Sequence, residues 1–206
     1  MEDLDGDQPE SDDYCPHFAC KRFPTCAESV NFLAEVTGAT QVYRVLGMAT
    51  PKFILELREK IGHDLLWLSG LTGVVLDDSE QILLVRRVDN NRWSLIGGIL
   101  EPGEEPAVGL IREVHEETAV DVAVDRLVSV QALPPTGYPN GDRVQFLDLC
   151  FRCHPLRGEP RVNDDESLEV RWWPLAHLPP LTPRELTSIE NALSPDPMPV
   201  FVTAED

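Results

Sequence analysis

The sequence lacks long apolar runs and the signals of export. No stretch of its 206 residues approaches the roughly 18 consecutive apolar residues that a membrane-spanning helix requires. The N-terminus is acidic, and it has neither the basic first segment nor the apolar second segment of a signal peptide. We therefore expect a cytoplasmic protein that has no membrane partner.

Positive charge is also scarce. The chain has 17 Lys and Arg against 36 Asp and Glu, which gives a formal net charge of -19. This balance argues against a partner made of nucleic acid, because surfaces that bind such polymers are strongly basic. A small anionic substrate would approach against the field of the protein, so its site needs local arginines and a metal ion.

Cysteine gives no disulfide framework. There are five cysteines, an odd number in a chain without an export signal. Four potential zinc ligands fall within one short segment, and these are Cys15, His17, Cys20 and Cys26. Their spacing lacks the C-x2-C pair of common zinc sites, so it favours unmetallated thiols over the alternative of a structural zinc. Cys150 and Cys153 fall in a predicted strand, where residues three apart face opposite sides, which favours packing over redox chemistry.

Composition divides the chain into an extension and a domain. Residues 1–47 begin with an acidic segment that is poor in large apolar side chains, so we expect a partly disordered N-terminal extension that is also rich in cysteine. Met48 resembles a natural start, which leaves an over-long translation as the alternative to an added segment. Residues 48–206 are predicted to form one domain.

Apolar spacing predicts more strands than helices, and no internal repeat is present. A first helix is expected between Thr50 as N-cap and Gly62, and a last one between a capping box at 182–185 and about Leu193. Strands are expected at 65–68, 71–76, 81–85, 93–96, 122–133, 143–153 and 168–173. A loop rich in turn residues, 134–142, separates two of these strands.

The stretch 98–120 concentrates the reactive side chains. Pro106 suits the first turn of a helix, and no helix breaker follows before 118, which predicts a helix over 106–118. At about 100° per residue, one face of this helix is apolar, while Glu113, Glu116 and Glu117 share a neighbouring wedge. Carboxylates at this spacing repel each other, so a positive charge should lie beside them. Because all the ligands are oxygen atoms, the cluster predicts a hard divalent cation, and Mg²⁺ is preferred when a phosphate completes the coordination shell of the metal.

This stretch resembles the Nudix box, the signature G-x5-E-x7-R-E-U-x-E-E-x-G-U of the Nudix hydrolases, in which U is aliphatic. The matching residues are Gly98, Glu104, Arg112, Glu113, Val114, Glu116, Glu117 and Val120. Ala119 stands in place of the late glycine, and this small residue is tolerated unless the backbone requires a positive φ. The resemblance implies an α/β (α+β) fold in which a mixed β-sheet is sandwiched between helices.

The resemblance also implies a metal site. It makes Glu113, Glu116 and Glu117 the ligands of Mg²⁺, or of Mn²⁺ as a substitute, and Glu104 supports the metal directly or through water. Gly98 belongs to the same site, because a backbone without a side chain can approach a phosphate or a metal-bound oxygen. The alternative is a solvated acidic helix face, which is the usual meaning of a charge run.

Catalytic roles follow in the same way. The residues expected to act in catalysis are Glu117, Glu116, Arg112 and Glu166. Arg112 would orient a box glutamate, with a surface ion pair as its alternative. Glu166 lies in an acidic loop before a predicted strand, where several Nudix enzymes keep a further glutamate, and Asp164 and Asp165 compete with it for this role.

Four residues are expected to bind substrate: Arg87, Arg143, Trp93 and Tyr138. The arginines would take phosphate charge, and Arg86 and Arg92 compete for the same task. The two aromatic rings would stack on a base. Solvated arginines and packed rings are the alternatives for each of these residues.

The chemistry that suits such a site is attack of water on a phosphorus of a nucleoside diphosphate linked to a group X. Pro135 and Tyr138 resemble features that accompany hydrolysis of ADP-ribose and of dinucleoside polyphosphates in parts of the family. We favour ADP-ribose or a similar nucleotide sugar. The alternatives are a nucleoside triphosphate of the 8-oxo-dGTP type, a dinucleoside polyphosphate, and a domain that senses a nucleotide without catalysis. Homodimers are common among Nudix proteins, so the resemblance allows one here.

Overall fold

The computed structural model describes residues 50–203. Its elements in chain order are α1 (Lys52–Ile61), β1 (Leu65–Val75), β2 (Gln81–Arg87), β3 (Trp93–Ser94), β4 (Ile96–Ile99), α2 (Pro106–Thr118), β5 (Asp121–Ala132), β6 (Thr136–Gly137), β7 (Arg143–Arg157), β8 (Ser167–Pro174), a 3-10 helix (Leu175–His177), α3 (Pro183–Leu193) and β9 (Val200–Phe201). No helix within 50–203 is long and apolar enough to cross a membrane. The expected extension 1–47 lies outside the described residues, and so do Cys15, His17, Cys20 and Cys26.

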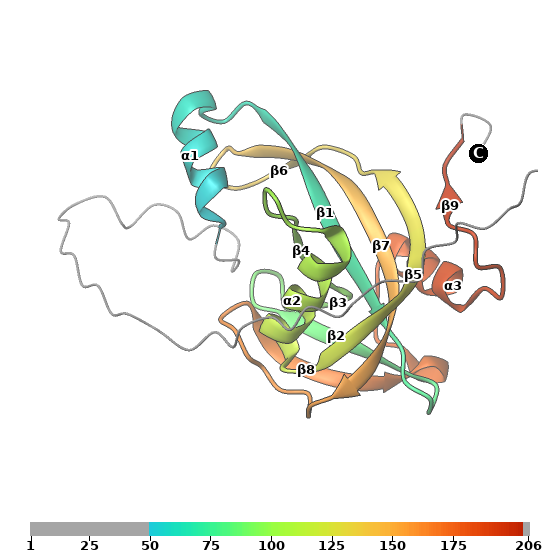
Figure 1. The fold of residues 1–206 in the computed structure, drawn as a ribbon. Helices are drawn as coiled ribbons and strands as arrows, with labels where there is room; N and C mark the ends of the chain where they lie inside the picture. Colours follow the sequence, from blue (N-terminus) through green and yellow to red (C-terminus); the bar gives the residue numbers. More distant parts are fainter. Residues whose placement is uncertain (1–49, 204–206) are drawn as a thin grey trace, which may run out of the picture. The chain divides into compact units, whose positions relative to one another are not determined.

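The strands form two sheets. The larger sheet has the order β4-β1-β7-β5-β9, and β6 pairs with the start of β7. It is mixed, because β1 and β7 are parallel while β4 and β5 run antiparallel to their neighbours β1 and β7. The smaller sheet, β3-β2-β8, is antiparallel. Figure 1 shows β1, β7 and β5 side by side, with the helices on either side of them.

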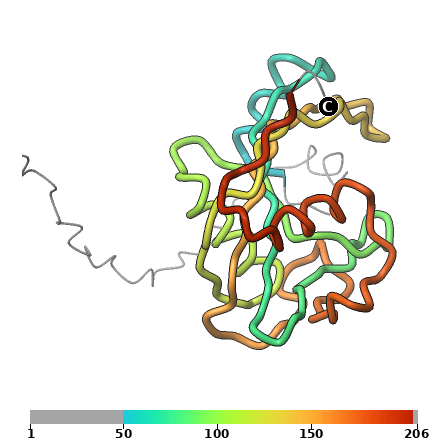
Figure 2. The backbone as a smooth tube through the Cα atoms, turned by 90° about the vertical axis from the view of Figure 1, so that its right-hand side faces the viewer, coloured from blue at the N-terminus to red at the C-terminus, as the bar shows by residue number. Residues whose placement is uncertain are grey.

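Helices cover both faces of the larger sheet. Alternate residues of β1 point to opposite sides, so Leu71 and Val75 pack with α2 while Val74 and Leu76 pack with α3. Each cluster also contains side chains of β2 and of β7. In Figure 2, which is turned by 90°, α3 lies in front of the strands. The predicted mixed sheet between helices is thus confirmed.

Cys150 and Cys153 occupy opposite faces of β7, as the spacing predicted. Cys150 belongs to the cluster under α3 and Cys153 to the cluster under α2, and both are fully buried. Burial raises the pKa of each thiol to about 12. The two thiols therefore stay protonated near neutrality, and packing is their role.

β1 is one strand where the sequence predicted two. Ser69 and Gly70 interrupt the apolar pattern, but β7 pairs with β1 without a break from Leu65 to Val75. A long parallel partner supplies the hydrogen bonds that local propensity does not. Four other predicted strands differ at their ends, and the observed limits are 81–87, 121–132, 143–157 and 167–174. The strand predicted at 93–96 is divided between β3 and β4.

The helix ends agree with the predictions except at one cap. Pro51 is the N-cap of α1 and no side chain bonds the first turn, so the prediction of Thr50 as N-cap is wrong. Gly62 ends the helix with φ 60°, as expected. The capping box of α3 is present, because Thr182 N donates to Glu185 Oε2 over 2.7 Å and Glu185 N donates to Thr182 Oγ1 over 3.3 Å.

Candidate active site

The carboxylates of α2 lie beside β4, where two consecutive glycines have no side chains to obstruct them. The helix runs from Pro106 to Thr118, as predicted, and packs on β4, β5 and β1. A Cβ atom at Gly98 in β4 would collide with the carboxyl group of Glu113. A Cβ atom at Gly97 would come within 2.6 Å of the carbonyl oxygen of Leu71. Gly98 therefore lets Glu113 of the helix lie against the backbone of β4, and Gly97 lets β4 lie close to β1.

The box glutamates share a cavity with the acidic loop that precedes β8. The cavity has a volume of about 280 Å³ and is lined by Glu113, Glu116, Glu117, Asn163, Asp164 and Glu166. The loop is fastened to the end of α2, because Asn163 Nδ2 donates to the carbonyl of His115 over 3.1 Å and Arg161 N donates to that of Thr118 over 3.1 Å. The predicted Glu166 and its competitor Asp164 both lie here.

Burial and mutual repulsion set the electrostatics of this cavity. Glu117 is only 5% exposed, and burial raises its pKa well above the ordinary value, with further contributions from the negative charges of Asp164, Glu113 and Glu166. The positive charge of Arg87 opposes these effects. Burial also raises the pKa of Glu113 and of Asp164. In each of these three groups the loss of hydration on burial is the largest contribution to the shift.

Arg112 organises the outer carboxylates. Its Nε and Nη2 atoms bind Glu104 Oε1 and Oε2 over 2.9 and 3.0 Å in a bidentate pair. Its Nη1 atom lies 3.0 Å from Glu113 Oε1 and 3.0 Å from Glu116 Oε2. These hydrogen bonds hold the pKa of Glu104 below its ordinary value. Glu104 therefore reaches the site through Arg112, and it is not among the residues that line the acidic cavity.

The donor chemistry of the cavity suits a divalent cation. Within residues 50–203, no group of three or more His, Cys, Asp or Glu side chains stands in an arrangement that would hold a metal ion. The carboxylates that line the cavity are nevertheless hard oxygen donors, of the kind that Mg²⁺ and Mn²⁺ prefer. A cation would also relieve the repulsion that raises the pKa of Glu117.

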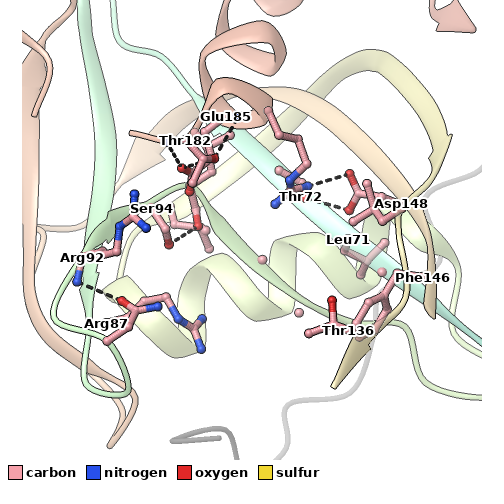
Figure 3. A pocket seen from close by; sticks show the side chains of 18 of the residues that line it. Leu71, Thr72, Arg87, Arg92, Ser94, Thr136, Phe146, Asp148, Thr182 and Glu185 are labelled. Atoms are coloured by element: carbon pink, nitrogen blue, oxygen red, sulfur yellow. Dashed lines mark hydrogen bonds and ion pairs between the residues drawn. The ribbon is translucent and has the colours of Figure 1, made fainter. Parts of the chain in front are cut away.

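A larger cavity adjoins β4 on the side away from α2. Its volume is about 520 Å³, and Gly97 and Gly98 form part of its wall. Arg87, Arg92, Trp93 and Tyr138 also line it. Figure 3 shows Arg87 and Arg92 on one side of this cavity and Thr72 with Asp148 on the other.

Arg87 links the two cavities. Its Nε and Nη2 atoms donate to Asp89 Oδ1 and Oδ2 over 3.0 and 3.1 Å. Burial lowers its pKa, but the hydrogen bonds and charge of Asp89, with the charges of Glu117 and Glu166, raise it overall. A permanent positive charge therefore lies in the larger cavity within electrostatic reach of the acidic one.

The other predicted substrate residues differ in their surroundings. Trp93 lines the larger cavity and also packs edge to face against Trp173, with 5.2 Å between ring centres. Tyr138 lines it while half-buried against the cluster under α1. Arg143 does not line it: its carbonyl accepts from Arg58 Nη2 over 2.8 Å and the residue is exposed at the start of β7. The competing Arg86 instead pairs with Glu169 at 3.3 Å.

Sequence reasoning missed several residues of the larger cavity. Asp148 and Arg184 are the most informative of these, because they carry opposite charges and lie 3.3 Å apart. One signal was present in the sequence. Asp148 is a lone acid between Leu147 and Leu149 in an apolar strand, and buried acids are rare unless paired.

Comparisons with known proteins agree with this arrangement. The NUDIX domain family matches residues 69–192. A MutT-like protein of Streptomyces ambofaciens is 39% identical over 118 residues, which are 57% of this chain and 66% of that protein, just under two thirds of its length. A Bacillus subtilis (strain 168) protein provisionally named an 8-oxo-dGTP diphosphatase is 38% identical over 130 residues, 61% of this chain and 82% of that protein.

A solved structure shares the fold. An ADP-ribose pyrophosphatase from Streptococcus suis 89-1591 is similar with a TM-score of 0.51 and 25% identity, over 66% of this chain and 98% of that chain. The family match covers α2, the residues of both cavities and most of α3. The chain therefore belongs to the Nudix family.

Proposed function

We propose that this protein is a Mg²⁺-dependent pyrophosphohydrolase that cleaves a nucleoside diphosphate linked to a group X, with ADP-ribose or a similar nucleotide sugar as substrate. The observation that carries the proposal is the adjacency of two unlike cavities. The first is lined by five carboxylates and an asparagine, while the second adds arginines and aromatic rings to its acids, and Arg87 acts on both. A substrate with phosphates at its centre and a ring at its end matches that pairing.

The acidic cavity supplies the groups for phosphate hydrolysis. Glu113, Glu116 and Glu117 would hold the metal with Glu166, and a bound Mg²⁺ would neutralise phosphate charge and acidify the attacking water. Glu117 is suited to accept the proton of that water, because its raised pKa lies closer to neutral pH, where a general base is most effective. Arg112 keeps the box glutamates in place through its contacts at 3.0 Å.

The larger cavity supplies substrate binding. A volume of about 520 Å³ lies within the range of roughly 300–1,000 Å³ that is usual for small-molecule sites. Arg87 and Arg92 would take phosphate charge, and Tyr138 and Trp93 would contact the rings of the substrate. The similarity to an ADP-ribose pyrophosphatase of Streptococcus suis supports this choice of substrate.

A nucleoside triphosphate is the second candidate substrate. The similarity to the provisionally named 8-oxo-dGTP diphosphatase of Bacillus subtilis favours it, since the match spans 82% of that protein. A triphosphate would place the same phosphates between the same two cavities. Dinucleoside polyphosphates share this chemistry. A sensor without catalysis is disfavoured because all the box carboxylates are present.

An assay of the full chain with Mg²⁺ tests the proposal. The panel contains ADP-ribose, a dinucleoside polyphosphate, 8-oxo-dGTP, dGTP and NADH, and the products are separated by chromatography. We expect ADP-ribose to give the highest kcat/KM and to yield AMP and ribose phosphate. A higher kcat/KM for 8-oxo-dGTP would show that the substrate is a nucleoside triphosphate, and the proposed reaction would still hold. If no member of the panel is hydrolysed with Mg²⁺ or Mn²⁺, the proposal that the protein is a pyrophosphohydrolase is wrong.

A further inference from the structure

Asp148 is a buried carboxylate in the wall of the larger cavity. It belongs to β7 and is 6% exposed. Thr72 Oγ1 donates to its Oδ1 atom over 2.8 Å, and Arg184 Nη1 lies 3.3 Å from its Oδ2 atom. A charged group in such a place lowers stability unless partners compensate for its lost hydration. Two partners from β1 and α3 are present, one on each oxygen.

A purely structural ion pair does not explain the space around Asp148. The residue opposite it in β1 is Gly70, and a Cβ atom there would lie 3.5 Å from Asp148 Oδ1 and 3.3 Å from the Phe146 ring. Because residue 70 is glycine, no side chain of β1 stands beside Asp148 Oδ1 at this position. Arg184 is also 43% exposed, so its contact contributes little to stability as a partly solvated pair.

The polar groups around Asp148 match a polyol. Hydroxyl, carboxylate and guanidinium groups from four elements or their caps line the cavity that contains Asp148, and they belong to Thr72, Ser94, Asp148, Thr182, Arg184 and Glu185. Figure 3 shows Thr72 and Asp148 together, with Phe146 and Leu71 on an adjoining apolar wall. A nucleobase is a flat aromatic ring that packs best against other rings. A sugar ring instead offers several hydroxyls and one apolar face, which is the distribution found here.

We propose that Asp148, positioned by Thr72 and Arg184, accepts hydrogen bonds from neighbouring hydroxyls of the sugar in group X of the substrate. The inference rests on the proposed function and names the residue that selects a nucleotide sugar within it. Each carboxylate oxygen can accept more than one hydrogen bond, so both keep capacity for a ligand hydroxyl. An adjacent pair of hydroxyls therefore fits the carboxylate, as ribose hydroxyls fit acidic residues in dinucleotide sites.

The test compares two ligands that share the ADP part and differ in whether the group X is a sugar with hydroxyls or a plain alkyl chain. The ligands are ADP-ribose and the ADP ester of a simple alkyl alcohol, and the proteins are wild type, Asp148→Asn and the control Glu190→Gln on the exposed side of α3. Binding is measured by calorimetry in EDTA, and kcat/KM is measured with Mg²⁺. Asn keeps the shape of Asp148 and loses its charge, and melting curves confirm that each variant is folded.

We expect wild type and Glu190→Gln to prefer ADP-ribose by about 10- to 100-fold in both measurements, as hydrogen bonds to a charged group provide. Asp148→Asn should lower this preference at least fivefold by affecting ADP-ribose alone. An equal loss for both ligands would show that Asp148 only supports the fold, and an unchanged preference would show that it does not touch the sugar. Either outcome overturns the inference.

A second variant tests access to Asp148 without altering any polar group. Gly70→Ala adds one methyl group beside Asp148 Oδ1, and it should reduce the preference for ADP-ribose while the ADP alkyl ester binds as before. The calorimetric result does not depend on catalysis. If wild type hydrolyses nothing, the proposed function fails while binding still decides the inference. If wild type hydrolyses ADP-ribose and both variants keep its preference, only the inference fails.

Discussion

Ala119 has a left-handed backbone, with φ 59° and ψ 19°, at the end of α2. The Nudix box has glycine at this position, and the structure gives the reason: the chain turns here so that Ala119 N can bond the carbonyl of His115 over 2.9 Å before β5 begins. An L-residue in this conformation is destabilised by about 1–2 kcal/mol relative to glycine. The backbone at Ala119 is therefore strained, although the fold accommodates this residue.

Replacement of Ala119 by glycine should stabilise the protein. The strain is relieved, and the greater entropy of glycine in the unfolded chain offsets part of the gain, so we expect a net increase of about 1 kcal/mol. Thermal unfolding should rise by roughly 2–4 °C. Ala107→Gly, at a helical position of the same element, is the control and should lower stability. No increase for Ala119→Gly would show that the strain is absorbed by neighbouring residues.

Glu117→Gln should remove nearly all turnover and leave the fold intact, because it deletes a charge at constant shape. We expect kcat to fall more than tenfold, a rise of at least about 1.4 kcal/mol in the barrier. Glu59→Gln, on the exposed side of α1, is a control for loss of a surface carboxylate. A Glu117→Gln enzyme with more than a tenth of the wild-type kcat would exclude Glu117 from a central role.

The difference in stability between wild type and Glu117→Gln should depend on pH. Burial raises the pKa of Glu117 in the folded protein above its ordinary value of 4.5, so protonated Glu117 is compatible with folding and ionised Glu117 opposes it. The contribution of Glu117 to stability is therefore fully present below about pH 4.5 and is lost as the pH rises through the raised pKa. In EDTA at pH 8, Glu117→Gln should melt no lower than wild type, and its advantage should shrink toward pH 5. A variant that melts lower than wild type at pH 8 would contradict a destabilising Glu117 charge.

Among the elements, α2 could be predicted to the residue, while the cavities could not. The limits of α2 follow from neighbouring residues, since Pro106 favours a start and residue 119 turns the chain. The polar wall of the larger cavity depends on contacts across the fold. Thr72 and Asp148 are 76 positions apart, and Asp148 and Arg184 are 36 apart. No local spacing indicates such contacts, because they arise from the pairing of β1 with β7 and the docking of α3.

The loop before β7 is held by the end of α1. Asp142 accepts from His63 Nδ1 at 2.8 Å and lies 3.4 Å from Arg58 Nε, so the loop has a fixed base. Tyr138 N donates to the carbonyl of Asp142 over 2.9 Å within the same turn. The tyrosine is therefore both packed and exposed to the larger cavity, and its ring can contribute to stability and to binding.

Substitution of Tyr138 separates these two contributions. Tyr138→Ala should raise KM for the preferred substrate and change the ranking among substrates, with kcat on a minimal substrate nearly unchanged, because uniform binding is lost. A half-buried ring should also contribute about 1–2 kcal/mol to stability. The measurements are kcat and KM for two substrates beside a melting curve, with Tyr138→Phe as the control that keeps the ring. If the ranking among substrates is unaltered, this loop does not contact the part of the substrate that lies away from the metal.

At the scale of the whole molecule, a strongly acidic chain lines one cavity almost entirely with acidic side chains and places several cationic groups in the next. The net charge of -19 disfavours any further anion, including the substrate. Arg87 and a bound cation would together offset this field locally. Metal and substrate are thus expected to bind with positive coupling, because each reduces the repulsion that opposes the other.

Addition of Mg²⁺ should raise the thermal stability of wild type, since a ligand that binds only the folded state stabilises it by about 2.7 kcal/mol at a hundred times its Kd. The expected rise saturates with Mg²⁺ and is reversed by EDTA. Screening of a net charge of -19 would also stabilise the fold, so NaCl of equal ionic strength is the necessary control. Glu117→Gln should reduce the Mg²⁺-specific part and keep the response to NaCl. An equal response of both proteins to Mg²⁺ would show that the cation acts on the general acidity of the surface and that the acidic cavity does not bind it through Glu117.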